Sequence, residues 1–507
     1  MTHGRSGKEP EAVTDGRGRT PRVAVIGGGA GGIAMGVALR RLGIYDFTIF
    51  EQSDGVGGTW WDNTYPGAEV DIPVPLYSFS FHSFAFTRTH VKQRELLDYL
   101  ESVVDRYHLR PHFSLKTRVN EVVWDEADHS YEVRFRDNEL LRFDVVVSAV
   151  GILNHPKYPD WPGLESFAGA KFHSARWDHD VDIKGKRVAV VGTGSSSAQL
   201  VPAIAPVVDK LYVYQRQPGW ILPKGDRDLT PAERARMLKP LHRRKLRLQQ
   251  ALVYERNHGS RIEGSKNNLK SQRAAEAFIE EVFSGHDDLK KAVTPDYPFG
   301  IKRPVQDSNF YRTLLEDHVE LVPHEVVEVD ANGIIDGAGV HREVDVLVMC
   351  TGFQPSNFLA TFEVKGRNGQ SIHEAWKGEP KAFLGLMVPG FPNFYMLYGP
   401  NTNAGSIMFM HERQVDFISI QLRRMIRHAT TAIELRPSVM NLFDRIVQDR
   451  LNRNVVAKYP EVHFYGRAAS GRNVIGWDEG MLPYAILCRF SPRICATATR
   501  LARRSKR

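Results

Sequence analysis

The sequence predicts an α/β fold made of two Rossmann-like dinucleotide-binding domains, with a helical insertion in the second domain. Two observations lead to this prediction. A glycine-rich turn follows an apolar strand twice, beginning at Gly27 and at Gly192, and a long stretch rich in Leu, Arg and Lys lies beyond the second turn. Each turn has the order strand, tight turn and helix, which is the arrangement that cradles a pyrophosphate.

The first turn follows the run Val-Ala-Val-Ile and has glycine at the three fingerprint positions, Gly27, Gly29 and Gly32. Its bare backbone amides and the positive end of the next helix can hold two phosphates. The following apolar run ends at Glu51. A carboxylate at the tip of that strand suits the two free hydroxyls of a ribose, so we expect FAD at this turn.

The second turn follows the run Val-Ala-Val-Val, and we expect its residues to hold a second pyrophosphate: Gly192, Thr193, Gly194 and Ser195. Ser197 stands where the fingerprint has its third glycine. The next strand ends at Gln215 and Arg216, without an acid. A guanidinium at this tip suits a 2′-phosphate, so we expect NADPH as the second dinucleotide.

Two more apolar strands, at 144–147 and 344–349, run into small-residue turns where the chain can change domains. These turns set the expected boundaries. We expect a disordered N-terminal tail at 1–20, an FAD-binding domain at 21–150 and 380–488, an NADP-binding domain at 151–224 and 301–379, a helical insertion at 225–300 and a basic C-terminal tail at 489–507.

The insertion has a clear helix start at Thr230-Pro231-Ala232-Glu233, which combines a capping threonine, a first-turn proline and a glutamate at the third position. Leucines then recur among many Arg and Lys residues, and we expect the basic face to be exposed to solvent. A further helix is expected over about 266–283. Helices inserted in this way commonly cover an active site.

The composition is that of a water-soluble globular protein, since 42% of the 507 residues are hydrophobic and 25% are charged. No apolar run approaches the length of a membrane span, and residues 1–20 lack a signal-peptide core. The three cysteines, Cys350, Cys488 and Cys495, form no Cys-x-x-Cys pair. We therefore expect a cytoplasmic protein without disulfides or a metal site.

The net charge of +8 is concentrated at one end of the chain, because residues 489–507 contain seven Arg and Lys and no acid. This distribution argues against a nucleic-acid partner. We expect a solvated tail that keeps the protein soluble. Weak contact of the tail with an anionic membrane surface is the alternative.

Three segments together resemble one enzyme family. Residues 167–178 match the fingerprint Phe-x-Gly-x-x-x-His-x-x-x-Trp-(Pro/Asp), and they stand just before the second glycine-rich turn. The segments 57–71 and 300–304 also match the family in order and spacing. On these segments the chain resembles the type I Baeyer–Villiger monooxygenases over about residues 20–410. It departs from the family at Thr64, where many members have arginine.

The resemblance implies roles for particular residues. Arg303 would stabilise a flavin C4a-peroxide, and Asp71 would orient and compensate Arg303. Lys302 would join Arg216 near the 2′-phosphate. The residues expected against the flavin are Gly58, Thr59, Trp60 and Asp62. The fingerprint residues expected at the joint between the two nucleotide domains are Phe167, Gly169, His173 and Trp177.

The function implied by the resemblance is an NADPH- and O2-dependent FAD monooxygenase that converts ketones to esters or lactones through a C4a-peroxyflavin. The alternative is a flavin monooxygenase that oxidises nitrogen or sulfur, including thioethers, and a non-catalytic FAD-binding protein is a second one. A disulfide reductase is excluded, because it needs a redox cysteine pair against the flavin and no cysteine precedes Cys350.

Overall fold

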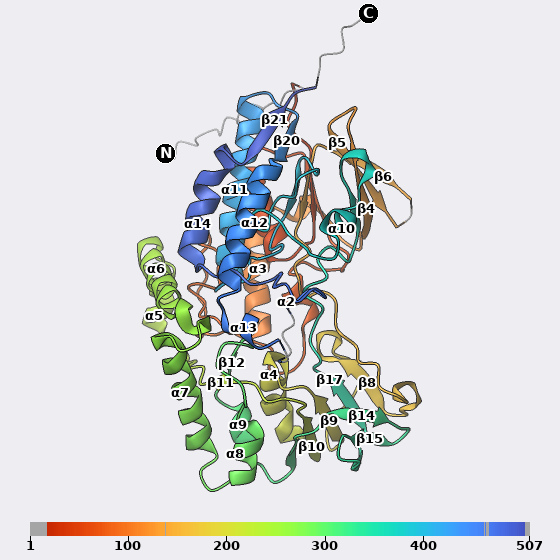
Figure 1. Cartoon of the computed structure of the whole chain (residues 1–507), viewed down its shortest axis with the longest axis vertical. Coiled ribbons are helices and arrows are strands. Elements are labelled where there is room, and N and C mark those ends of the chain that lie inside the picture. Colours follow the sequence, from red (N-terminus) through yellow and green to blue (C-terminus); the bar gives the residue numbers. More distant parts are fainter. Residues whose placement is uncertain (1–17, 137, 461, 463–465, 502–507) are drawn as a thin grey trace, which may run out of the picture.

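The computed structural model describes residues 18–136, 138–460, 462 and 466–501. It contains two α/β units, one above the other in Figure 1, with a group of helices along one side. We call the unit that contains the first glycine-rich turn the first unit and the other the second unit. The prediction of an α/β fold with two nucleotide-binding units and a helical insertion is confirmed.

The first unit is built on a sheet of five parallel strands. Strands of such a sheet are apolar because both faces of the sheet are covered, and most side chains of these strands are buried. The strands run in the order β19 (Phe394–Met396), β7 (Val145–Ser148), β1 (Val23–Ile26), β2 (Phe47–Phe50) and β3 (Phe113–Ser114). One face packs against helices α1 (Ala30–Arg41), α3 (Gln93–Arg106) and α11 (Ile407–Arg427).

The other face of this sheet packs against a second, mainly antiparallel sheet. It contains β18 (Glu363–Lys365), β4 (Val119–Asp125), β5 (Ser130–Phe135) and β6 (Leu140–Phe143). Strand β18 pairs in parallel with β4. The expected boundary at residue 379 is therefore wrong for 363–365, because the chain has already returned to the first unit. Helix α10 (Ile372–Trp376) packs into the same core.

The second unit also has a five-stranded parallel sheet. Its order is β13 (Val319–Val322), β10 (Lys210–Tyr214), β9 (Arg187–Val191), β17 (Val346–Met349) and β8 (Ala170–His173). Helix α4 (Ser195–Ile204) follows β9 and contacts α9 (Phe310–Thr313). A small sheet of β14 (Val326–Val329), β15 (Gly333–Asp336) and β16 (His341–Glu343) covers the outer end, and β11 (Ile221–Leu222) pairs with β12 (Val305–Gln306).

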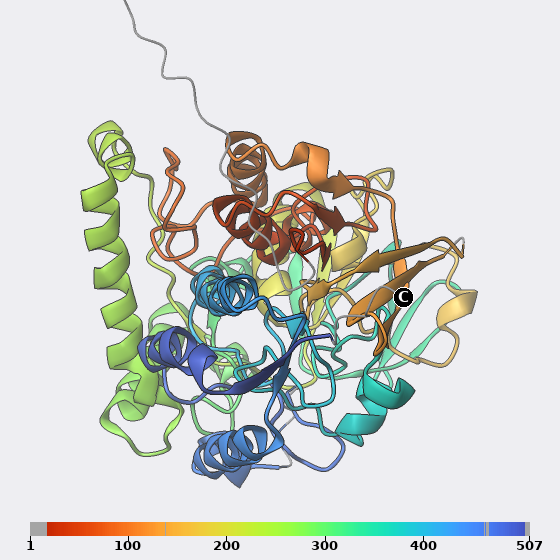
Figure 2. The ribbon, with the colours of Figure 1, turned by 90° about the horizontal axis from the view of Figure 1, so that it is seen from above.

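The helical insertion contains α5 (Pro231–Met237), α6 (Pro240–Asn257), α7 (Lys266–Val282) and α8 (Asp287–Val293). The capping box at Thr230 and Glu233 is present, as predicted. Helix α6 packs on the core of the first unit through Ala251, whereas α7 packs on the second unit. Figure 2 shows α6, in light green, running along one side of the molecule.

The exposed face of α6 is not the expected one. Arg243 and Arg247 are buried, while Leu241 and Leu248 are exposed. Both arginines donate to backbone carbonyls of the loop at 75–80. The prediction of a solvated basic face is therefore wrong for these two arginines, because the first unit presents carbonyl oxygens that only a long donor can reach.

The C-terminal region returns to the first unit as α12 (Pro437–Leu451), α14 (Met481–Phe490), the 3₁₀ turn η7 (Ser491–Arg493) and β21 (Ala496–Thr499). Between them, α13 (Val455–Lys458) packs on the core of the second unit. Strand β21 pairs antiparallel with β20 (Ala432–Leu435), and Cys495 is buried. A solvated tail from residue 489 is therefore wrong as far as Thr499. The predictions for 1–17 and 502–507 lie outside the described residues. Among the described residues, no helix is long and apolar enough to cross a membrane.

Removing the Arg247 charge should loosen the insertion. Arg247 also donates to the buried carboxylate of Glu412 on α11. Arg247→Ala leaves that carboxylate with the Ser80 N–H and hydroxyl as donors but without its counter-charge, and should cost about 3–5 kcal/mol. We expect faster amide hydrogen exchange in α5 and α6, with Arg244→Ala as the control, because Arg244 is exposed on the same helix. Equal exchange rates in the two variants would contradict this anchoring role.

Candidate active site

The first glycine-rich turn has positions where only glycine fits, because any side chain would clash with backbone oxygens. Gly27 has φ +111°, and a side chain there would approach the Ala149 carbonyl oxygen to 2.6 Å. A side chain at Gly32 would overlap the carbonyl oxygen of Gly27. The turn therefore leads into α1 without side chains that would cover the first backbone N–H groups of the helix, and these groups can bind phosphate.

Glu51 lies at the tip of β2, as predicted, and its carboxylate faces this turn. One oxygen accepts a hydrogen bond from the Gly28 backbone N–H at 2.7 Å, and the other accepts from the Ser53 N–H at 2.8 Å. The side chain is buried. Its position is thus fixed by two backbone donors before any ribose binds.

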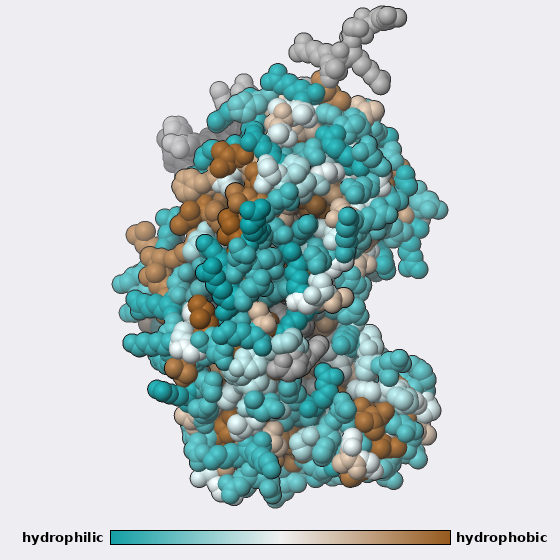
Figure 3. Space-filling model, viewed as in Figure 1, coloured by the Kyte–Doolittle hydropathy of each residue, from teal (hydrophilic) through white to brown (hydrophobic). Residues whose placement is uncertain are grey.

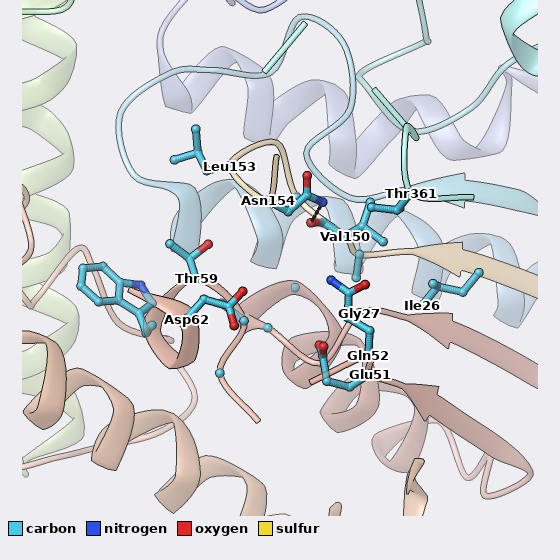
Figure 4. Close-up of a pocket in the computed structure, with 18 of the residues that line it drawn as sticks. Ile26, Gly27, Glu51, Gln52, Thr59, Asp62, Val150, Leu153, Asn154 and Thr361 are labelled. Carbon is cyan, nitrogen blue, oxygen red and sulfur yellow. Dashed lines mark hydrogen bonds between the residues drawn. The ribbon is translucent and has the colours of Figure 1, made fainter. Parts of the chain in front are cut away.

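A pocket of about 1070 Å³, including its open mouth, extends from this turn. Figure 4 shows Thr59, Asp62, Glu51 and Gln52 among the side chains that line it. The remaining predicted flavin-side residues, Gly58 and Trp60, also line it. Burial is the main cause that raises the pKa of the Asp62 carboxyl. The pocket therefore brings the first glycine-rich turn, Glu51 and the segment 57–62 around one space.

One buried group in the pocket supports the fit to FAD. His411 on α11 lines the pocket and is 5% exposed, and its Nδ1 has no hydrogen-bond partner among the described residues. A side chain at Gly31, in the first turn of α1, would lie 3.1 Å from the ring. The imidazole therefore stands beside the helix N-terminus that binds phosphate, where a bound dinucleotide could pair with it.

The second turn repeats this geometry. Gly192 has φ +111°, and a side chain there would lie 2.5 Å from the Cys350 carbonyl oxygen. Ser195 is the first residue of α4, while Gly194 precedes it and has open space around it. Thr193 lies between these glycines. The amides at the start of α4 are thus accessible to a second pyrophosphate.

The two predicted cations of the second site lie together. Arg216 is exposed just beyond β10, and Lys302 donates a hydrogen bond to the Gln217 side chain at 2.5 Å. Lys302 also lies 4.9 Å from the centre of the Tyr297 ring. Burial, followed by the charge of Arg216, lowers the pKa of Lys302 to about 8. Two cations in one place create a site that favours a dianion.

Arg303 and Asp71 are 232 residues apart in sequence and in contact in space. The Arg303 guanidinium donates to Asp71 Oδ2 at 2.9 Å. The arginine side chain is 48% exposed, whereas that of Asp71 is 15% exposed. Both charges act on Tyr77, which lines the FAD pocket. The pair therefore stands next to the pocket and across the two units.

Gln199 on α4 completes this arrangement, and sequence reasoning missed it. Its side-chain N–H donates to Asp71 Oδ1 and to the Glu69 carbonyl, each at 3.1 Å. Its Oε1 accepts from the Tyr65 hydroxyl at 2.8 Å and from the Glu69 N–H at 3.2 Å. No local pattern marks this glutamine, because its partners lie about 130 residues earlier in the chain.

A buried ion pair next to Gln199 was also missed by the sequence analysis. Lys224 donates to Glu69 at 2.5 Å, and their side chains are 1% and 7% exposed. Lys92 contacts the other Glu69 oxygen at 2.6 Å. These contacts fix the segment that leads to Asp71.

The fingerprint histidine fastens the joint between the units. His173 Nε2–H donates to the Gly352 carbonyl at 3.0 Å, and Nδ1 accepts from the Ala175 N–H at 3.1 Å. Burial lowers the pKa of His173 to about 4, so the ring is neutral. The Lys157 N–H donates to the same carbonyl at 2.8 Å. His173 thus fixes the point where the two inter-unit connections run side by side.

The other fingerprint residues pack within the second unit. Phe167 is buried, and Trp177 packs edge-on against Phe172 at 5.0 Å. A side chain at Gly169 would overlap the Asp345 carbonyl oxygen. Thr64, the departure from the family, contacts the His179 ring at 2.7 Å.

The chain that follows β19 leads to the pocket at the start of α11. Ile407, Met408 and His411 line the pocket. Tyr398 packs against His411 with the ring centres 5.7 Å apart. Asn401 and Asn403 form hydrogen bonds with the chain at 473–476.

Comparison with known proteins first defines the class. The family model described as pyridine nucleotide-disulphide oxidoreductase matches residues 24–279. That match agrees with the two dinucleotide sites, whereas the three cysteines are all free and buried. The chain is a two-dinucleotide flavoprotein oxidoreductase, without the cysteine pair that disulfide chemistry needs.

The family within this class follows from closer relatives. A Baeyer–Villiger monooxygenase of Streptomyces coelicolor is 38% identical over 476 residues, which cover 90% of this chain and 88% of the relative. One of Pseudomonas aeruginosa is 36% identical, covering 94% and 91%. The chain belongs to the Baeyer–Villiger monooxygenases, flavin-dependent enzymes that convert ketones to esters or lactones.

Solved structures agree. An oxidized steroid monooxygenase bound to NADP has a TM-score of 0.85 at 28% identity, covering 94% of this chain and 99% of that one. A cyclohexanone monooxygenase from Rhodococcus bound to NADP+ has a TM-score of 0.82 at 27% identity, covering 95% and 99%. The cofactors of this chain are FAD and NADP.

A substitution in the first turn should weaken FAD binding specifically. Gly32→Ala forces a methyl group into the Gly27 carbonyl and should raise the FAD dissociation constant about 10- to 100-fold. Gly194→Ala is the matched control in the second turn, because its methyl group meets no atom within 4 Å. Flavin content and fluorescence titration measure the effect. Equal FAD affinities in both variants would contradict the steric argument.

Proposed function

We propose that this enzyme inserts one oxygen atom of O2 beside the carbonyl of a ketone at the Arg303–Asp71 pair. NADPH supplies the two electrons, the second oxygen atom leaves as water, and the product is an ester or a lactone. The observation that carries this proposal is the contact of Arg303 with Asp71 beside the FAD pocket.

In this proposal, FAD binds to the first unit and NADPH binds at the second glycine-rich turn, in the second unit. When bound, FAD accepts hydride from NADPH and activates O2. Gly27, Gly29, Gly32 and Glu51 would hold its pyrophosphate and ribose, and Thr59, Trp60 and Asp62 its other end. The start of α4 would hold the NADPH pyrophosphate, with its 2′-phosphate between Arg216 and Lys302.

Arg303 supplies a fixed positive charge where negative charge develops on oxygen. Guanidinium suits this task because it stays protonated and has several donors in a planar fork. Asp71 accepts one of these donors and holds the fork in place. Gln199 and the Glu69–Lys224 pair hold Asp71, so the orientation of Arg303 is determined by groups that do not touch substrate.

His173 contacts neither the pocket nor Arg303. We propose that it holds the joint at Gly352 while the second unit moves relative to the first during NADPH use. We also propose a cytoplasmic location, which the three free cysteines support.

Replacing the arginine tests the proposed reaction. Arg303→Ala should retain FAD and NADPH-driven flavin reduction but lower ester formation at least about 100-fold, since one preorganised charge is lost. NADPH oxidation should then yield hydrogen peroxide in place of ester. The matched control is Arg312→Ala, an exposed arginine paired with Glu281 on the second unit. Ester formation at the unaltered rate in Arg303→Ala would contradict the assignment.

The low pKa of Lys302 gives a pH prediction. Lys302 is protonated below about pH 8, so its attraction for a 2′-phosphate is present there and is lost as the pH rises through 8. The kcat/KM for NADPH should therefore fall above pH 8, while that for NADH changes little.

Two variants check the cause of this fall. Lys302→Gln should remove the pH dependence. Arg216→Ala should raise the KM for NADPH far more than for NADH, and it should move the fall to higher pH because the Arg216 charge lowers the Lys302 pKa. Parallel pH profiles for NADPH and NADH in the unaltered enzyme would contradict the phosphate-binding role.

A further inference from the structure

The C-terminal helix α14 presents an apolar face to solvent. Ile486, Phe490 and Ile494 are 59%, 62% and 70% exposed; Ile486 and Phe490 lie on α14, and Ile494 follows the turn η7. Figure 3 shows brown side chains gathered over α14 at the upper left of the molecule. The four-residue spacing places Ile486 and Phe490 on one side of α14, and Ile494 adds a third exposed apolar side chain just beyond the helix. We call these three residues the α14 stripe.

Arginines accompany this stripe. Arg489 and Arg493 are exposed, alternate with the apolar residues and are also four residues apart. They form no ion pair within 4 Å among the described residues. Arg489 acts on Asp416, and this acid is itself paired with Arg413 at 2.8 Å. The face is therefore both apolar and cationic.

An open hollow of about 570 Å³, including the solvent space at its mouth, lies nearby at the C-terminal ends of α1 and α11; we call it the arginine cavity. It is lined by three arginines and two apolar side chains: Arg41, Arg423, Arg427, Leu42 and Ile426. Arg423 and Arg489 both act on Asp416, which places the cavity next to the α14 stripe. The C-termini of α1 and α11 each have a partial negative charge, which one positive charge more than balances. Three guanidinium groups around one hollow therefore leave an excess of positive charge that suits an anion.

From these observations we infer that this end of the molecule docks on an anionic phospholipid bilayer. The stripe of Ile486, Phe490 and Ile494 enters the interfacial layer, Arg489 and Arg493 lie at the phosphate level, and the arginine cavity receives a lipid phosphate.

A second copy of the chain fits this face less well, because pairing would bring the cations of both copies together. An anionic bilayer matches both the charge and the apolar side chains. The inference does not depend on the proposed reaction, since no residue of the face lines the FAD pocket.

The test uses the full-length, FAD-loaded enzyme and vesicles of phosphatidylglycerol mixed with phosphatidylcholine, compared with phosphatidylcholine alone. We expect co-sedimentation with the anionic vesicles that weakens at high salt. Phe490→Ser with Ile494→Ser should abolish it, and Arg423→Gln with Arg427→Gln should weaken it about 30-fold. Since all four side chains reach solvent or the cavity, the variants should keep their FAD.

Matched controls are Val340→Ser, an exposed apolar residue of the second unit, and Lys184→Gln with Lys186→Gln, two exposed cations there. Both should bind vesicles like the unaltered enzyme. Three results would overturn the inference: no binding to anionic vesicles, equal binding to both vesicle types, or equal loss in the controls. A change of oligomeric state in Phe490→Ser with Ile494→Ser, with vesicle binding intact, would show a contact between copies and would overturn it as well.

Discussion

The ion pair between Arg303 and Asp71 is the contact on which the arrangement of the site depends. Asp71 belongs to a segment of the first unit, while Arg303 comes from the chain that leaves the helical insertion. An exposed arginine alone would sample many rotamers. Here one carboxylate oxygen holds the guanidinium, and the other is held by Gln199 of α4. The position of the cation therefore depends on how the second unit sits against the first.

Because the site depends on the orientation of the two units, the contacts that hold the units together matter for it. The two connections between the units pair with each other near Lys157 and Gly352, and His173 adds a neutral, buried hydrogen bond at that point. On the opposite side, Arg247 fastens α6 to the first unit through Glu412 and backbone carbonyls. Contacts of this kind fix the mutual orientation of two units that each have a separate core.

Much of the fold could be predicted from the sequence because local chemistry determines it. The turn glycines, Glu51 and the capping box at Thr230 act within a few residues of themselves or at one strand tip. Arg303 and Asp71 were found through family motifs and not through their spacing. Gln199, His411 and the buried arginines of α6 could not be found, since their roles come from partners far away in the chain.

The C-terminal segment shows the same limit. Its charge predicted a solvated tail, yet Ala496–Thr499 forms β21 because it pairs with β20 and because Cys495 and Ala496 are buried in the core of the first unit. A short strand of alternating Ala and Thr has no strong signal of its own. Its structure therefore depends on pairing with β20, which lies about 65 residues earlier in the chain. Arg489 and Arg493, which precede the strand, lie on the surface of an ordered segment and not in a tail.

Incubation of the purified enzyme with FAD, NADPH, isotopically labelled O2 and a panel of ketones and thioethers tests the central claim most directly. The account predicts esters or lactones that carry one labelled oxygen atom. Labelled sulfoxides with no ester would contradict it, and they would remove from Arg303 and Asp71 the role given to them here.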